Sequence, residues 1–184
     1  AGCDQVCLRC TPAAQLRQVQ SLDEVELLFK QLQSPTAGAY NMAISALARS
    51  QGSSDALSLL DKMRQACVTP DVISFSTAIS ACRHGGQWER MLLLLDEMRN
   101  TKVKHDVMSF SAAISVCEKS ERWEEALSVL DRMRGEDVMP NEISFNAAIS
   151  ACQKGGQLEQ ALSLLGRMRR SDIKPSVISF SSAI

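Results

Sequence analysis

The sequence predicts an all-α fold, a right-handed α-solenoid of stacked helix-turn-helix repeats. Three observations lead to this prediction. One sequence phrase recurs every 35 residues without insertion from Ala37 to Ile184. Each copy carries two apolar stripes with the period of a helix. A break and a helix-capping residue separate successive copies. Each copy is therefore a helical hairpin that buries its stripes by stacking on its neighbours.

The repeated phrase defines the expected repeat boundaries. Its clearest copies occupy 72–82, 107–117 and 142–152, a worn copy occupies 37–47, and another begins at 177. A second phrase, close to Leu-Asp-x-Met-Arg, returns with the same period. We therefore expect repeats at 37–71, 72–106, 107–141 and 142–176, with a partial repeat at 177–184.

Two helices are predicted in each repeat. In the repeat at 72–106, apolar residues along 72–82 form the first stripe, and those along 88–98 form the second after Gly85-Gly86. Proline lacks an amide donor and restricts the residue before it, so it ends the second helix of most repeats. The next first helix then begins after a good N-cap residue. The prolines are Pro70, Pro140 and Pro175, and the cap residues are Asp71, Asp106, Asn141 and Ser176.

Residues 1–36 match the repeat poorly, and we expect a degenerate N-terminal repeat or a cap there. Apolar residues between 22 and 32 form one amphipathic stripe that resembles a second helix. Cys3, Cys7 and Cys10 lack a fourth ligand and the paired spacing of zinc sites, so we expect no metal there. The chain begins without Met and stops inside a repeat, from which we expect a fragment of a longer protein.

The charge and cysteine patterns limit the class of protein. Because 20 basic and 21 acidic residues nearly cancel, any RNA site must depend on local charges. Cys82, Cys117 and Cys152 lie on the apolar stripe of their repeats, where free cysteine acts as a small hydrophobe. We therefore expect a reduced, intracellular protein rather than a disulfide scaffold. No apolar run of about 18 residues exists, so we expect no membrane span.

Catalytic signatures are missing from the sequence. Its two histidines, His84 and His105, have no carboxylate partner at helical spacing. The zinc-deaminase signature His-x-Glu with Cys-x-x-Cys is absent as well. We expect no enzyme activity and no cofactor in this stretch, whereas an appended domain beyond Ile184 stays open.

The repeat resembles the pentatricopeptide repeat, and the resemblance covers 37–184. The tetratricopeptide signature Trp-x2-Leu-Gly-x2-Tyr is absent. The chain departs from the pentatricopeptide consensus in having Phe for the usual Tyr, Ser for the usual Thr, and His105 where the other repeats have proline. The phrases that carry the resemblance in the fourth repeat are Ile-Ser-Phe-Asn at 143–146, Lys-Gly at 154–155, Ala-Leu-Ser-Leu-Leu at 161–165, Met168 and Lys-Pro at 174–175.

This resemblance implies that the protein binds single-stranded RNA with one base per repeat. In the family, the residue after the aromatic and the last residue of the repeat select the base together. We name these two residues the base-selecting pair. The four pairs are Asn41 with Asp71, Ser76 with Asp106, Ser111 with Asn141, and Asn146 with Ser176, followed by Ser181 without a partner. The family's pairing rules imply the RNA 5′-UGAC-3′.

Two further sets of residues belong to the predicted site. The resemblance implies that the second residue of each repeat flanks a base, and a basic residue near the end of each first helix would follow the phosphates. The cap residues and the basic residues also have a simpler explanation, as helix caps and as solvated surface. Asn and Ser in the first turns of a helix gain little intrinsically, which favours a function for the first member of each pair. The flanking residues are Ile73, Met108, Ile143 and Ile178, and the basic residues are Arg49, His84, Lys119 and Lys154.

Two functions from different classes are consistent with this sequence. The resemblance implies an RNA-binding protein that supports RNA processing, stability or translation in a mitochondrion or chloroplast, together with other RNA-processing proteins. The alternative is an α-solenoid scaffold for protein–protein interaction, which predicts exposed apolar patches on the first helices. The varying polar pairs favour RNA.

Overall fold

A computed structural model describes residues 12–32, 34–50 and 53–182 of the chain. Every regular element in these ranges is a helix, which confirms the predicted all-α class. None of these helices is long and apolar enough to cross a membrane. The chain divides into two compact units, Ala1–Gly85 and Gly86–Ile184. Cys3, Cys7 and Cys10 lie outside the described residues.

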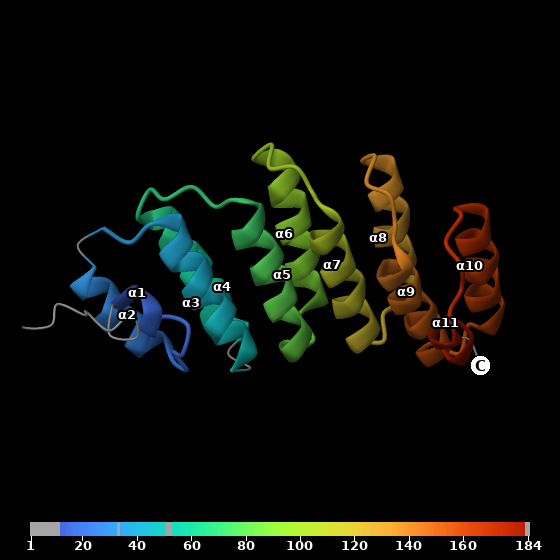
Figure 1. Cartoon of the computed structure of the whole chain (residues 1–184), viewed down its shortest axis with the longest axis horizontal. Helices are drawn as coiled ribbons and strands as arrows, with labels where there is room; N and C mark the ends of the chain where they lie inside the picture. The colour runs from blue at the N-terminus through green and yellow to red at the C-terminus, as the bar shows by residue number, and fades with distance from the viewer. Residues whose placement is uncertain (1–11, 33, 51–52, 183–184) are drawn as a thin grey trace, which may run out of the picture. The chain divides into compact units, whose positions relative to one another are not determined.

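In the N-terminal unit, α3 packs against both α4 and α5, and α2 adjoins α4 (Figure 1). The ring of Phe29 on α2 meets the ring of Tyr40 on α3 edge-on, with centroids 4.6 Å apart. The segment before the first repeat therefore covers part of that repeat. The helices are α1 (Pro12–Gln15), α2 (Leu22–Gln31), α3 (Ala37–Arg49), α4 (Ser53–Gln65) and α5 (Val72–Gly85).

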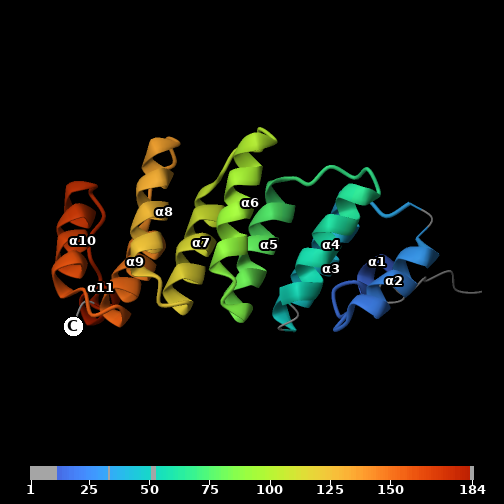
Figure 2. The ribbon, with the colours of Figure 1, turned by 180° about the vertical axis from the view of Figure 1, so that it is seen from behind.

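In the C-terminal unit, α7 packs against α8 and α9, and α9 packs against α10 and α11. Figure 2 gives the same order from behind, with the first helices α7 and α9 next to each other. The helices are α6 (Trp88–Asn100), α7 (Val107–Lys119), α8 (Trp123–Gly135), α9 (Glu142–Lys154), α10 (Leu158–Arg170) and α11 (Val177–Ser181).

The helix ends follow the sequence signals. The α5 helix ends at Gly85, and Gly86 adopts a φ of +60°, a left-handed conformation that favours glycine. Asp106 and Asn141 cap α7 and α9 by accepting the backbone N–H three residues later. These contacts confirm that the predicted cap residues begin the first helices.

The apolar stripes form the core between the helices. Phe75, Phe110 and Phe145, the aromatic residues of the repeated phrase, are buried completely or almost so. Cys82, Cys117 and Cys152 are also buried and carry free thiols, as the stripe predicted. Within each unit, the helices are therefore held together largely by apolar burial, which contributes about 25 cal/mol per Å².

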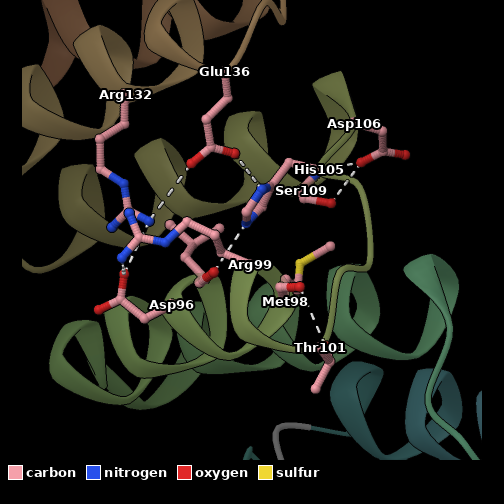
Figure 3. Close-up of polar contacts among 10 residues, drawn as sticks. Asp96, Met98, Arg99, Thr101, His105, Asp106, Ser109, Arg132 and Glu136 are labelled. Carbon is pink, nitrogen blue, oxygen red and sulfur yellow. Dashed lines mark hydrogen bonds and ion pairs between the residues drawn. The ribbon is translucent and has the colours of Figure 1, made fainter.

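His105 occupies the position where the other repeats carry proline, and the structure explains how the fold accommodates it. Its buried imidazole lies between two acceptors: Nδ1 meets a carboxylate oxygen of Glu136, and Nε2 lies 2.9 Å from the carbonyl oxygen of Leu95 (Figure 3). Arg132 lies 3.9 Å from Glu136 and 3.0 Å from Asp96. His105 thus joins α6 to the C-terminal end of α8 through polar contacts that proline cannot make.

Gly155 lies against the indole of Trp123, and this contact predicts a cost for adding a methyl group. A Cβ atom on Gly155 would lie 2.9 Å from Cγ of Trp123. We expect Gly155→Ala to lower the free energy of unfolding by about 1–3 kcal/mol, because the half-buried ring packed against this turn must shift. Urea unfolding followed by circular dichroism measures this change.

Gly166→Ala is the matched control, because a Cβ atom on Gly166, in the middle of α10, would meet nothing within 4 Å. Alanine should stabilise this helix by about 0.5–1 kcal/mol. Equal effects of the two substitutions would contradict the packing assigned to Gly155.

Candidate nucleic-acid interface

The first base-selecting pair is joined by direct hydrogen bonds. Asn41, on α3, donates from Nδ2 to Oδ1 of Asp71 at 3.1 Å, although 30 residues separate them. Ser74, the third residue of α5, donates from its hydroxyl to Oδ1 of Asn41 at 2.6 Å. The backbone N–H of Ser74 donates to Oδ1 of Asp71 at 2.8 Å. One buried serine therefore connects both members of the pair.

The third pair, Ser111 and Asn141, is connected through Ser144, the third residue of α9. The hydroxyl oxygens of Ser111 and Ser144 lie 2.9 Å apart. Ser144 donates to Oδ1 of Asn141 from both its hydroxyl and its backbone N–H, each at 2.9 Å. As at the first pair, a buried serine links the two members, but here the pair consists of a hydroxyl and an amide group.

The fourth pair, Asn146 and Ser176, is connected in the same way through Ser179 on α11. Ser179 donates from its hydroxyl to Oδ1 of Asn146 at 2.6 Å, and its oxygen lies 3.4 Å from that of Ser176. The unpaired Ser181 is exposed and donates to the carbonyl oxygen of Ile178 at 3.0 Å.

The members of the second pair, Ser76 and Asp106, belong to different compact units. Ser76 donates from its hydroxyl to the carbonyl oxygen of Ile73 at 3.2 Å. Asp106 accepts from the backbone N–H of Ser109 at 2.7 Å and from its hydroxyl at 2.5 Å. Ser109 therefore has the same relation to its cap residue as Ser74 and Ser144 have to theirs.

Sequence reasoning missed these connecting serines. Ser74, Ser109, Ser144 and Ser179 are fully buried, whereas a serine is usually exposed. Their invariance in the repeated phrase was the available signal, because a polar residue that recurs on a buried position must have recurring partners.

Hydrogen bonding controls the charge of Asp71. Burial raises the pKa of its carboxyl group, but the hydrogen bonds from Ser74 and Asn41 lower it more, so the pKa lies below its ordinary value of 3.8. Asp71 is therefore ionised at neutral pH and can only accept hydrogen bonds.

The predicted basic residues differ in how far intramolecular contacts occupy them. Arg49 donates to the hydroxyl of Ser45 and to the carbonyl oxygen of Arg17, both at 3.1 Å. Lys119 is exposed. The side chain of His84 lies outside the described part of the structure.

Lys154 is paired with a carboxylate from the preceding repeat. Its Nζ lies 2.7 Å from Oε1 of Glu118, which also accepts from the hydroxyl of Ser150 at 3.0 Å. Burial raises the pKa of Glu118, and the bonds from Lys154 and Ser150 lower it further than burial raises it. The ionised Glu118 thus neutralises part of the predicted basic surface.

The four predicted base-flanking residues are exposed apolar side chains. A side chain that projects into solvent from the start of a first helix can contact the face of a planar group beside the polar pair. The exposed fractions are 59% for Ile73, 69% for Met108, 62% for Ile143 and 63% for Ile178.

A cavity in the N-terminal unit brings three predicted roles together. Its volume is about 290 Å³. It is lined by the base-selecting Asn41, the flanking Ile73 and the basic Arg49, together with Arg17, which sequence reasoning missed. Arg17 belongs to the segment that does not repeat, so the 35-residue period gave no signal for it. Apolar, amide and guanidinium groups are thus concentrated in one hollow.

Metal chemistry requires a group of metal-binding side chains, and thiolate chemistry requires a thiol that ionises. The described residues hold no group of three or more His, Cys, Asp or Glu side chains arranged to bind a metal ion. Burial raises the pKa of the Cys117 thiol to about 12 and that of Cys152 to about 11, so neither forms the reactive thiolate at neutral pH.

The lowered pKa of Asp71 predicts a pH dependence of stability. An acid whose pKa is depressed by folding stabilises the fold above its ordinary pKa of 3.8, and this contribution is lost as the pH falls through the lower, folded-state pKa. We expect Asp71→Asn to remove this component of the acid dependence while keeping a capping oxygen. Urea unfolding of both proteins between neutral pH and the acid side of 3.8 tests it, and parallel stability curves would contradict it.

Three family models match this chain. The model described as pentatricopeptide repeat domain matches residues 35–84 and 93–155. The model described as PPR repeat family matches 140–184, and the one described as PPR repeat matches 73–102. Among curated protein sequences, none matches.

Solved structures with similar folds include pentatricopeptide repeat proteins. One is the crystal structure of PPR10 in complex with an 18-nt psaJ RNA element. Its sequence is 25% identical to this chain, and the TM-score is 0.78, with 94% of this chain and 26% of that chain covered. PPR10 from maize is 19% identical with a TM-score of 0.81 over 95% of this chain and 26% of that chain. The PPR domain of Arabidopsis thaliana protein-only RNase P 1 in complex with tRNA is 15% identical, with a TM-score of 0.71 over 87% of this chain and 86% of that chain. The present chain thus spans about a quarter of the length of PPR10.

Proposed function

This chain belongs to the pentatricopeptide repeat family, and from this membership we propose that it binds single-stranded RNA on its first helices. One base contacts each repeat, and the base-selecting pair bonds to the edge of that base. The PPR10 structure, which contains an RNA element and resembles this chain over 94% of its length, supports the proposal.

The cavity at the first pair is the observation that carries this proposal. A nucleotide offers an apolar base face, a hydrogen-bonding base edge and an anionic phosphate. The cavity provides a matching group for each: Ile73 for the face, Asn41 for the edge, and the guanidinium groups of Arg17 and Arg49 for the phosphate. This local supply of positive charge suits a chain whose net charge is -1.

A protein ligand is the alternative occupant of the same face. The exposed apolar residues, such as Met108 and Ile143, would also contact a protein partner. The base-flanking residues recur once per repeat, however, and each lies two positions after the cap residue of a base-selecting pair. This alternation favours a ligand that is itself periodic and alternates planar groups with charges, as single-stranded RNA does.

The finer proposal concerns sequence and location. We assign 5′-UGAC-3′ as the preferred RNA, and a mitochondrion or chloroplast as the compartment in which the protein supports RNA processing, stability or translation. Low-salt fluorescence anisotropy tests the first assignment with the UGAC RNA, a scrambled RNA and the matching DNA. Binding that favours the UGAC RNA and weakens with salt supports base selection, whereas equal binding to all three ligands contradicts it.

The fourth pair allows a swap of base preference. Asn146→Thr combined with Ser176→Asn should shift the fourth preferred base from C towards A, because the pair then presents different donors and acceptors. Anisotropy with four RNAs that differ at this position measures the shift. The first position serves as internal control, since Asn41 and Asp71 are unchanged. An unaltered preference for C in a variant that still binds RNA would contradict the assignment of Asn146 and Ser176 as the residues that select the fourth base.

The ion pair between Glu118 and Lys154 predicts a gain of affinity. Glu118→Gln removes the carboxylate that neutralises Lys154, so RNA should bind more tightly and with a steeper salt dependence, by up to about 0.7 in the logarithmic slope for one added phosphate contact. Glu124→Gln is the matched control, because it removes the same charge from an exposed position on α8. The same gain in both variants would show a general charge effect and no phosphate contact by Lys154.

A further inference from the structure

The buried serine of each first helix determines the direction of hydrogen bonds around it. A hydroxyl group has one proton to donate and two lone pairs that accept. In a fully buried position such as those of Ser74, Ser144 and Ser179, the proton must point at a protein acceptor. Once that acceptor is known, the donor or acceptor character of the neighbouring polar groups follows.

At the first pair, the carboxylate of Asp71 sets the starting point because it can only accept. Asn41 must face it with Nδ2, at 3.1 Å. The hydroxyl oxygen of Ser74 lies 2.9 Å from Oδ1 of Asp71 and 2.6 Å from Oδ1 of Asn41, and its one proton points at Asn41, because two acceptor oxygens would otherwise face each other at 2.6 Å. The groups left for a ligand are the second Nδ2 hydrogen of Asn41 and the remaining acceptor capacity of Asp71. A donor beside an acceptor complements uracil, whose edge has a carbonyl oxygen beside an N–H.

At the third pair, the order is reversed. The hydroxyl of Ser144 donates to Oδ1 of Asn141, so it has no proton left for Ser111, and Ser111 must donate to Ser144. Ser111 then presents only lone pairs to a ligand, and Asn141 presents its Nδ2 hydrogens. An acceptor beside a donor complements adenine, whose edge has an amino group beside a ring nitrogen.

At the fourth pair, the hydroxyl of Ser179 occupies Oδ1 of Asn146 at 2.6 Å. The amide nitrogen of Asn146 is therefore the group left for the ligand, and it donates. Cytosine has two acceptors on its edge that suit such a donor. At each of these three pairs, the hydrogen-bond direction agrees with the base that the family's pairing rules imply.

We propose that Ser74, Ser144 and Ser179 are specificity-determining positioning residues that set which donors and acceptors each base-selecting pair presents to single-stranded RNA. They touch no base themselves and act through the pair. The inference rests on the proposed function, because it concerns how the same site distinguishes bases. Ser109 holds the matching position beside Asp106.

Ser144→Ala in the full chain tests the proposal most directly, because the chain of hydrogen bonds at the third pair passes through this hydroxyl. Four RNAs that differ from 5′-UGAC-3′ only at the third base measure the preference by anisotropy. We expect the preference for A to fall by about tenfold, the worth of one directional hydrogen bond. The preference at the first base should stay within about twofold, because its bonds are intact.

Two companion variants separate positioning from structure. Ser144→Thr keeps the hydroxyl and should restore the preference for A, whereas Ser115→Ala, on α7 outside these bonds, should leave it unchanged. If Ser144→Ala unfolds, Ser179→Ala on the short terminal helix α11 gives the same test at the fourth base. A retained preference, or an equal loss of affinity for all RNAs, would overturn the proposal.

A measurement without RNA distinguishes failure of this inference from failure of the proposed function. Side-chain amide signals of Asn141 in the nitrogen-15 NMR spectrum report its hydrogen bonds, and Ser144→Ala should shift them while those of Asn41 stay in place. A shift in a protein that shows no base preference at any position would refute base selection and reduce the serine to a structural role. No shift would refute the positioning role itself.

Discussion

The contacts of α3 with α5, of α7 with α9 and of α9 with α11 must each satisfy a buried hydroxyl, and the candidate site depends on this constraint. An unsatisfied buried polar group costs about 1–3 kcal/mol, so Ser74 or Ser144 requires an acceptor from the repeat before it. Oδ1 of Asn41 meets this need for Ser74, and the cap residue Asp71 accepts the backbone N–H of Ser74. The bonds that hold one repeat against the next are therefore the same bonds that orient the base-selecting pair.

The fold could be predicted from the sequence because the apolar stripes and the helix-capping residues recur in every repeat. The two stripes of the repeat at 72–106 predicted helices that the structure places at Val72–Gly85 and Trp88–Asn100. The bonds around Ser74 and His105 could not be predicted, because their partners, Asn41 and Glu136, lie 33 and 31 positions away along the chain. Periodicity indicates which residues share a face, and it does not indicate which groups on adjacent faces meet.

The role of the basic residues was also hard to predict, because their partners lie in other segments of the chain. The basic residues near the ends of the first helices form a regular series in the sequence, but Lys154 meets Glu118 of the preceding repeat. Arg49 bonds to Arg17, in a segment that has no counterpart elsewhere in the chain. The positive charge available to a phosphate is thus set by neighbours outside the repeat that carries each cation, and the series overstates it for Lys154.

Capping a helix and selecting a base are compatible because Asp and Asn each carry two polar atoms at the end of the side chain. One oxygen of Asp71 accepts the N–H of Ser74, and Oδ1 of Asn141 accepts that of Ser144, so one terminal atom of each remains for a ligand. Ser176 has only one hydroxyl, and it takes part in a capping box in which the hydroxyl of Ser179 accepts the backbone N–H of Ser176. For Asp71 and Asn141, the simpler explanation as helix caps and the proposed role toward RNA therefore do not compete, since they use different atoms of the same side chain.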